Sequence, residues 1–272
     1  MDCIDALILG LVQGLAEYLP ISSSGHLEIC REILGLDLAG ADALEFDIAL
    51  HVATVLSTIV VLWKEFLPLC KSFFTFTRDD NFTYVCKILV SCIPVAIVGI
   101  CFKDFVEQFF GSGLTIVGCC LFVTAALLSF AYFFRNPQRE KSEADKGHDI
   151  TWRDALIIGC SQAVAVLPGL SRSGTTIATG LLLGDKRDKI AQFSFFMVII
   201  PILGQALLSV KDLIAGEGVG ESVGLLPLAV GFLASFVVGC IACKWMLDIV
   251  KKGKLIWFAV YCIVVGTLCL VW

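Results

Sequence analysis

The sequence predicts an all-α polytopic membrane protein, with six transmembrane helices and two re-entrant helical hairpins in an inverted-topology repeat. The chain is 58% hydrophobic and 17% charged, with a mean hydropathy of +0.89, and these values are far from those of soluble domains. It contains six apolar stretches long enough to cross a bilayer. In addition, residues 5–25 reappear at 154–174, so that Asp5 aligns with Asp154 and Gly25 with Gly174. We therefore expect residues 1–272 to form a single integral membrane domain.

The expected spans cover residues 44–63, 84–101, 113–134, 190–210, 223–243 and 254–272. Tryptophans lie at or near the ends of several of these stretches, where indole rings anchor a helix at the membrane interface: Trp63, Trp245, Trp257 and Trp272. The 13 cysteines are scattered through apolar segments without a paired framework, so we expect small core residues rather than disulfides or a metal site. No removable signal peptide and no nucleic-acid-binding surface are expected.

Each copy of the repeat is an apolar helical run that stops at a proline and restarts at serines, at Pro20 in the first copy and Pro168 in the second. In a membrane protein this pattern is typical of a broken helix that lines a site. The segments 64–82, 135–153 and 244–254 are rich in Lys and Arg and should be cytoplasmic, whereas 28–43, 102–112 and 211–222 are poor in them and should face outward.

This charge pattern is consistent only if 154–183 enters and leaves on the same side, so we predict that it is re-entrant, and by analogy that 4–30 is too. Three spans separate the copies, and an odd number inverts the second relative to the first. The expected organisation is repeat 1 at about 1–135, a polar cytoplasmic linker at 136–150 and repeat 2 at about 151–272.

The second restart carries Arg172, which is costly at membrane depth unless it meets an anion, and a guanidinium fits phosphate oxygens bidentately. The alternative is a structural ion pair with Glu17, and both hold if substrate displaces that contact. Hydroxyls and free N–H groups at the two helix starts form an anion site, and two such starts that face each other suit a diphosphate. The candidate phosphate-binding residues are Arg172, Ser22, Ser171, Ser173 and Thr176.

Three residues of the first copy are the catalytic candidates, namely Glu17, Ser23 and His26. His26 can donate or accept a proton near neutral pH. Glu17, which shares a helical face with Gln13, either holds a proton, orients His26 or binds a divalent cation. For Ser23 three roles stay open: nucleophile, helix cap or hydrogen-bond donor to phosphate. His51 lies inside a span and is interpreted as a packing residue or an interhelical hydrogen-bond partner.

The motifs EYLPISSSGH at 17–26 and LPGLSRSGTT at 167–176 resemble the two signatures of the bacitracin-resistance undecaprenyl-diphosphatase family, and the resemblance extends through FDIALHVATVLSTIVVLW at 46–63 and DKIAQFSFFMVIIP at 188–201. It implies a hydrolase of the bacterial plasma (inner) membrane that removes the terminal phosphate of undecaprenyl diphosphate. The active site would be accessible from the outer face. The reaction would recycle the lipid carrier for cell-wall synthesis and confer bacitracin resistance. The resemblance also implies a polyprenyl diphosphate lipid as substrate and a divalent cation, Mg²⁺ or Ca²⁺. The resemblance leaves open whether the protein forms a homodimer.

By position, the family's essential residues would be Ser23, His26, Ser171, Arg172 and Thr176. The family's first motif places a Glu or Gln four residues before a Glu, and Gln13 and Glu17 fill these positions. The resemblance thus makes both residues candidates for holding the metal, with Glu17 the sole carboxylate ligand from that helix. Whether Ser23 or His26 supplies the attacking atom is not decided by sequence.

A transporter or flippase of a polyprenyl phosphate is the main alternative function, because inverted repeats with broken helices are equally typical of alternating access. A carrier needs the arginine and the helix ends, but it needs neither Ser23 nor His26 as a reacting group. A channel is less compatible, because a single arginine with serines offers no ring of ligands along a pore. The sequence therefore favours the enzyme.

Overall fold

The computed structural model describes residues 1–36, 41–102, 109, 113–135, 147–214 and 223–272, and in these ranges every named element is a helix. The helices are, in chain order, α1 (Cys3–Ala16), α2 (Ser23–Leu34), α3 (Ala41–Val61), α4 (Trp63–Phe74), α5 (Asp80–Cys101), α7 (Leu114–Phe134), α8 (Trp152–Val164), α9 (Arg172–Leu183), α10 (Arg187–Met197), α11 (Ile199–Ile214), α12 (Leu225–Lys251) and α13 (Ile256–Val271). The all-α prediction is confirmed. Of the expected linker, only 147–150 lie within the described residues.

Among the described residues, five segments are long and apolar enough to cross a membrane: Ala43–Val61, Asp80–Cys101, Leu114–Phe134, Arg187–Ser209 and Leu225–Lys251. They correspond to five of the six predicted spans. The sixth predicted span, 254–272, coincides with α13, an apolar helix of 16 residues. Many large apolar side chains point away from the protein, among them Ile100 and Leu225, which are about four-fifths exposed, as expected where lipid is the solvent. The chain is a multi-pass membrane protein.

The segment 64–82, expected as a cytoplasmic loop, contains the helix α4. Its amphipathic sequence WKEFLPLCKSFF contains Pro68 inside the helix. The buried Leu69 packs into the main core while the lysines stay exposed. The basic segment therefore contains a short amphipathic helix rather than an irregular loop alone.

The two copies of the repeat fold as two helical hairpins, α1 with α2 and α8 with α9. Asp2 caps α1 in a capping box with Asp5, and Thr151 caps α8 in a capping box with Asp154. Ser22 and Ser171 cap the second helix of each hairpin, and these helices end at Gly35 and Gly184, both with positive φ. The repeated residues thus define the same start, break and end in both hairpins.

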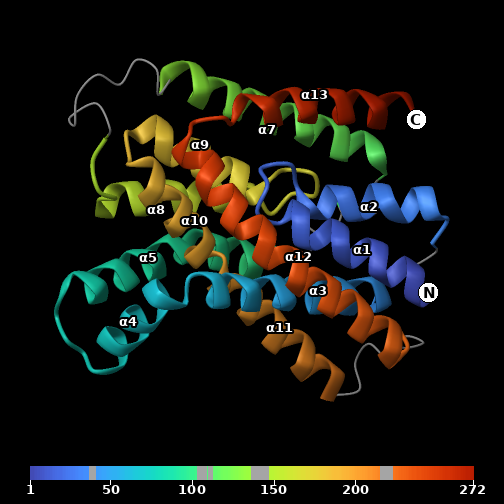
Figure 1. Cartoon of the computed structure of the whole chain (residues 1–272), viewed down its shortest axis with the longest axis horizontal. Helices are drawn as coiled ribbons and strands as arrows, with labels where there is room; N and C mark the ends of the chain where they lie inside the picture. Colours follow the sequence, from blue (N-terminus) through green and yellow to red (C-terminus); the bar gives the residue numbers. More distant parts are fainter. Residues whose placement is uncertain (37–40, 103–108, 110–112, 136–146, 215–222) are drawn as a thin grey trace.

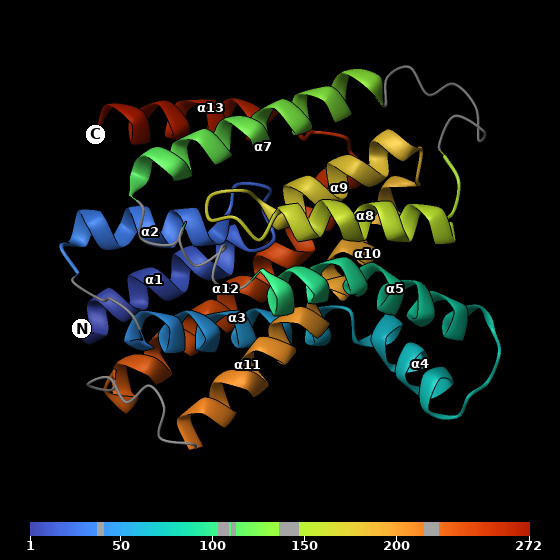
Figure 2. The same ribbon diagram turned by 180° about the vertical axis from the view of Figure 1, so that it is seen from behind.

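Each hairpin packs against a long helix of the other repeat, since α1 lies against α12 and α8 lies against α5. The repeated glycines allow this close approach: a Cβ on Gly10 would collide with the backbone carbonyl of Gly231, and one on Gly159 with that of Ser91. Helices α7 and α13 complete the bundle as a pair. Figures 1 and 2 show that the breaks after α1 and α8 lie side by side in the middle of the molecule.

The ends of helices that flank the Lys- and Arg-rich segments gather at one end of the molecule. In Figure 1 the α4–α5 connection, the C-terminal end of α7 and the N-terminal end of α8 lie at the left, whereas the N-terminus and the C-terminal end of α11 lie toward the right. The two breaks lie between these ends. The hairpins therefore place their polar restarts at depth within the bundle.

Candidate active site

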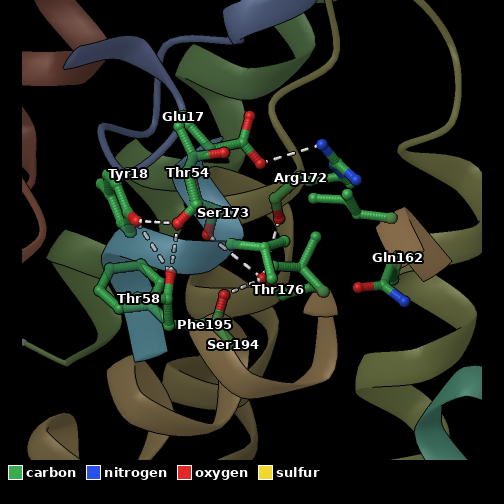
Figure 3. A pocket seen from close by; sticks show the side chains of 13 residues that line it. Glu17, Tyr18, Thr54, Thr58, Gln162, Arg172, Ser173, Thr176, Ser194 and Phe195 are labelled. Atoms are coloured by element: carbon green, nitrogen blue, oxygen red, sulfur yellow. Dashed lines mark hydrogen bonds and ion pairs between the residues drawn. The ribbon is translucent and has the colours of Figure 1, made fainter. Parts of the chain in front are cut away.

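Glu17 is the centre of the polar cluster at which the two breaks meet (Figure 3). It caps the C-terminal end of α1, and its carboxylate is almost fully buried. Its Oε1 accepts a hydrogen bond from Arg172 Nη2 at 3.0 Å, and its Oε2 accepts one from Ser23 Oγ at 2.6 Å. Gln13 Nε2 donates to Oε2 at 3.1 Å, and His51 Nε2 lies 3.5 Å from the same oxygen. Four side chains from α1, α2, α3 and α9 thus compensate the burial of one charge.

Arg172, the first residue of α9, forms the ion pair with Glu17 that the sequence left open as an alternative. It uses one guanidinium nitrogen for this contact, and within the described residues no other side-chain hydrogen bond engages the group. The side chain is 26% exposed. The rest of the guanidinium fork is thus accessible, so the ion pair with Glu17 leaves donors for the anion contact that the sequence predicts.

Ser23 is not the helix cap, because Ser22 occupies that position and accepts a hydrogen bond from the Gly25 amide at 3.3 Å. Ser22 has φ +72°, in the left-handed region that is rare for a non-glycine residue. This conformation turns the chain at the break, and Ser23 opens α2 with its hydroxyl on the Glu17 carboxylate. A hydroxyl on a buried carboxylate is the arrangement of a nucleophile with its general base.

The hydroxyls of the second restart are bonded within the protein. Ser171 caps α9 through the Gly174 amide at 3.0 Å, and Ser173 donates to the Leu19 carbonyl at 3.1 Å. Thr176 bonds to the Arg172 carbonyl at 2.8 Å and to the Ser194 hydroxyl at 2.7 Å. The Ser173 bond fastens one break to the other. These residues line or support the site, and their contact with phosphate stays a prediction.

His26 lies apart from the Glu17 cluster. Its Nδ1 is 2.8 Å from the Ser22 carbonyl, and its Nε2 is 2.8 Å from the hydroxyl of Tyr261 on α13, against whose ring it stacks. A carbonyl only accepts, so Nδ1 carries the proton and Nε2 accepts from Tyr261 in neutral His26. Both ring nitrogens are occupied, so a role of His26 as the attacking atom requires the Tyr261 hydrogen bond to open.

A pocket opens beside the cluster, between the two hairpins and helices α3, α10 and α11. Its polar lining comes from both repeats, with Glu17, Arg172, Ser173 and Thr176 from the breaks and Tyr18, Thr54, Thr58, Gln162 and Ser194 around them. The remaining lining is apolar. An apolar cavity with a few convergent polar groups is typical of a site for a small head group.

Gln13 and Glu17 are the residues predicted to hold a divalent cation. The Oε1 of Gln13 is buried and has no hydrogen-bond partner within the described residues, while its Nε2 points to Glu17. An unpaired amide oxygen next to a carboxylate fits a hard cation, and Mg²⁺ is often bound by one or two carboxylates together with substrate phosphates. The donor set is therefore compatible with Mg²⁺ or Ca²⁺.

Sequence reasoning missed the contact of His51 with Glu17, having interpreted His51 as packing or interhelical hydrogen bonding. Its Nδ1 lies 2.7 Å from the Asp47 carbonyl, which directs Nε2 toward the site. It also missed Tyr18, whose hydroxyl lies within 2.6–2.8 Å of Thr54, Ser57 and Thr58 on α3, and Tyr261. The one feature of the sequence that could have indicated this role is the position of His51 inside an apolar membrane span.

Comparison with known proteins gives a match over residues 6–268 to the family model described as bacitracin resistance protein BacA. A protein of Bacteroides thetaiotaomicron named undecaprenyl-diphosphatase is 57% identical over 266 residues, which cover 98% of this chain and 97% of that protein. Proteins of the same name from Christiangramia forsetii and Oceanobacillus iheyensis are 44% and 36% identical, over 98% and 97% of this chain and 96% and 94% of their own lengths.

Proposed function

The chain belongs to the bacitracin resistance protein BacA family, and on this premise we propose that it hydrolyses undecaprenyl diphosphate to undecaprenyl phosphate and inorganic phosphate. It is a membrane phosphatase, and its product is the lipid carrier used again in cell-wall synthesis. We attribute the bacitracin resistance named in the family description to this activity. The observation that carries the proposal is the Glu17 cluster, in which a hydroxyl, a carboxylate and a guanidinium from the two breaks converge.

We assign the attack to Ser23. Its Oγ forms a bond to the terminal phosphorus, the bond from that phosphorus to the bridging oxygen breaks, and the Ser23 proton passes to Glu17 across the 2.6 Å hydrogen bond. Undecaprenyl phosphate leaves, and water then hydrolyses the phosphoserine to release inorganic phosphate. Gln13 and His51 hold Glu17 in place for both steps.

Arg172 and the two helix starts bind the diphosphate. The N-terminal ends of α2 and α9 offer backbone N–H groups and the positive ends of two helix dipoles. Arg172 adds bidentate donors that hold the transferring phosphoryl group more tightly as charge builds up. A transporter would use these binding groups as well, but the hydrogen bond from Ser23 to Glu17 has no part in transport.

A divalent cation, Mg²⁺ or Ca²⁺, is part of this proposal. Glu17 and Gln13 would hold it together with the diphosphate oxygens, and when bound it supplies charge neutralisation to the phosphates. We further propose that the protein lies in the bacterial inner membrane with its Lys- and Arg-rich end in the cytoplasm. The site lies between the two ends, and we propose that the substrate reaches it from the outer face.

The test is phosphate release from a long-chain polyprenyl diphosphate by the purified protein in detergent. We expect release that depends on protein concentration and rises with added Mg²⁺ or Ca²⁺. An Arg172→Ala variant of normal size-exclusion behaviour serves as the inactive control. Absence of release above background, with or without metal, would contradict the enzymatic proposal and favour a carrier.

A further inference from the structure

A second polar cluster lies at the opposite end of the second hairpin. It consists of His148 near the end of the linker, Asp154 in the first turn of α8, and Asp185 in the turn between α9 and α10. Helix α8 has 13 residues and rises about 1.5 Å per residue, so the cluster lies about 20 Å from the break at Pro168. Figures 1 and 2 show that this end of α8 faces away from the breaks.

We propose that His148, Asp154 and Asp185 form a binding site for a divalent transition-metal ion of the zinc type, separate from the catalytic cluster. His148 Nδ1 lies 3.4 Å from Asp185 Oδ1 and 3.8 Å from Asp154 Oδ2. Ligand atoms around a tetrahedral Zn²⁺ with bonds of about 2.0–2.2 Å are separated by about 3.3–3.6 Å. The three ligand atoms all lie within 4.8 Å of one another, so small side-chain shifts would bring them to the spacing of a single ion.

Asp185 is the residue that points to a ligand. Its side chain is fully buried, and neither carboxylate oxygen has a hydrogen-bond partner within the described residues. Buried carboxylates without hydrogen bonds are costly. Burial raises the pKa of Asp185 to about 7 and the charge of Asp154 adds to the rise, while His148 and Arg135 act in the opposite direction. A bound dication would compensate the two facing carboxylates.

The surroundings of His148 orient it as a ligand. Its Nε2 lies 3.3 Å from the Leu183 carbonyl and can donate a proton there, which leaves Nδ1 for the ion, and metal-bound histidines commonly have such a partner on the other nitrogen. The Asp149 carbonyl, 3.1 Å from Nδ1, is a further oxygen at the site.

The backbone holds this arrangement in place. The His148 amide donates to the Gly184 carbonyl at 3.0 Å, and the Lys186 amide donates to the His148 carbonyl at 2.9 Å. A histidine nitrogen with two carboxylate oxygens suits Zn²⁺ or Mn²⁺ better than Mg²⁺, which prefers oxygen alone. The ion would join the end of the linker to both helices of the hairpin that carries Arg172.

The test is a Zn²⁺ titration of the full chain, stripped of metal with a chelator, against a chromophoric zinc indicator. We expect one tight site that also raises the midpoint of thermal unfolding. His148→Gln and Asp185→Asn should weaken binding at this site at least tenfold. Asp149→Asn, which removes an exposed neighbouring carboxylate paired with Lys186, should leave it unchanged. Asp154 is not varied, because it also caps α8.

Two further comparisons of Zn²⁺ affinity between variants identify where the ion binds. Thiol binding is common to all variants and cancels in the comparison of His148→Gln with Asp149→Asn. Glu17→Gln, which alters the catalytic cluster, should retain the site even if phosphate release is lost. Equal Zn²⁺ affinity in all variants, or loss in Glu17→Gln but not in His148→Gln, would overturn the proposal. Phosphate release by His148→Gln and Asp185→Asn, measured separately, reports on the proposed function and on folding.

Discussion

Glu17 receives contacts from residues of both repeats, and Arg172 is the only one of them that comes from the second break. This ion pair therefore joins the two halves of the site, together with the bond from Ser173 to the Leu19 carbonyl. Arg172 uses one guanidinium nitrogen for the contact with Glu17, and the other nitrogens remain available to an anion. A lysine at this position could keep the charge and even the ion pair, but it could not reproduce a planar fork.

Arg172→Lys should therefore reduce turnover by about 100-fold or more, or about 2.7 kcal/mol of transition-state stabilisation, which is the effect of losing one preorganised donor. The measurement is the rate of phosphate release at saturating polyprenyl diphosphate. Size-exclusion behaviour and thermal unfolding should stay near those of the unchanged protein, because the ammonium still pairs with Glu17. Near-normal turnover in a folded variant would mean that Arg172 serves structure alone.

Ser23→Ala tests the assignment of the attacking atom. If Ser23 attacks phosphorus, the alanine variant should lose turnover entirely while it still binds substrate through Arg172 and the helix ends. Ser24→Ala is the matched control, because Ser24 is the next residue of α2 and its hydroxyl meets Ser22 rather than Glu17; it should lose little. A residual rate in Ser23→Ala close to that of Ser24→Ala, together with complete loss in His26→Gln, would transfer the role to His26.

Much of this site could be predicted from sequence because its residues lie within two short motifs. Gln13 and Glu17 share a helical face, and the repeat pairs the two breaks, so the meeting of Glu17 with Arg172 was foreseeable as an ion pair. The position of His26 against Tyr261 was not foreseeable, because the two residues are far apart in sequence and α13 carries no polar signal for it. The same holds for His51, whose direction depends on the packing of α3 against α1.

At the level of helices, boundaries followed the sequence where caps were present. Asp2, Ser22, Thr151 and Ser171 begin their helices through side-chain hydrogen bonds, and Gly35 and Gly184 end theirs. The helix α4 was missed because its lysines were counted as loop charge, although its apolar side chains recur with helical spacing. The Lys and Arg count predicts which segments lie at the cytoplasmic end, but it does not distinguish a loop from an amphipathic helix.

The glycines at helix contacts matter for packing rather than for backbone freedom, since Gly159 has an ordinary helical conformation. Gly159→Ala should destabilise the protein by about 1–3 kcal/mol, because the added Cβ meets the Ser91 backbone, which cannot move aside without shifting α5. Thermal unfolding in detergent is the measurement. Gly204→Ala in α11 is the control, since nothing lies within 4 Å of its added Cβ, and it should be neutral or slightly stabilising. Equal effects of the two substitutions would exclude close packing as the reason for Gly159.

Across the whole molecule, each hairpin packs against a long helix of the other repeat, and the bond from Ser173 to the Leu19 carbonyl joins the two breaks. Neither repeat therefore completes a site or a core alone. This reciprocity agrees with one integral unit rather than two separable halves, and it explains why the linker between them need not place the halves itself. The site is a consequence of how the repeats pack.

The orientation of this unit in the membrane is predicted by the Lys and Arg count, and it determines which side the substrate comes from. In a cysteine-free variant, single cysteines at 106 and 217 should react with a membrane-impermeant maleimide in intact cells, whereas those at 143 and 251 should react only after permeabilisation. The reason is electrostatic: segments 135–153 and 244–254 carry the basic residues that remain cytoplasmic, and 102–112 and 211–222 carry one lysine each. The helix ends that flank the basic segments also share one end of the molecule. Labelling at 143 from outside would reverse the orientation, place the zinc-type cluster outside the cell, and exclude an active site reached from the outer face.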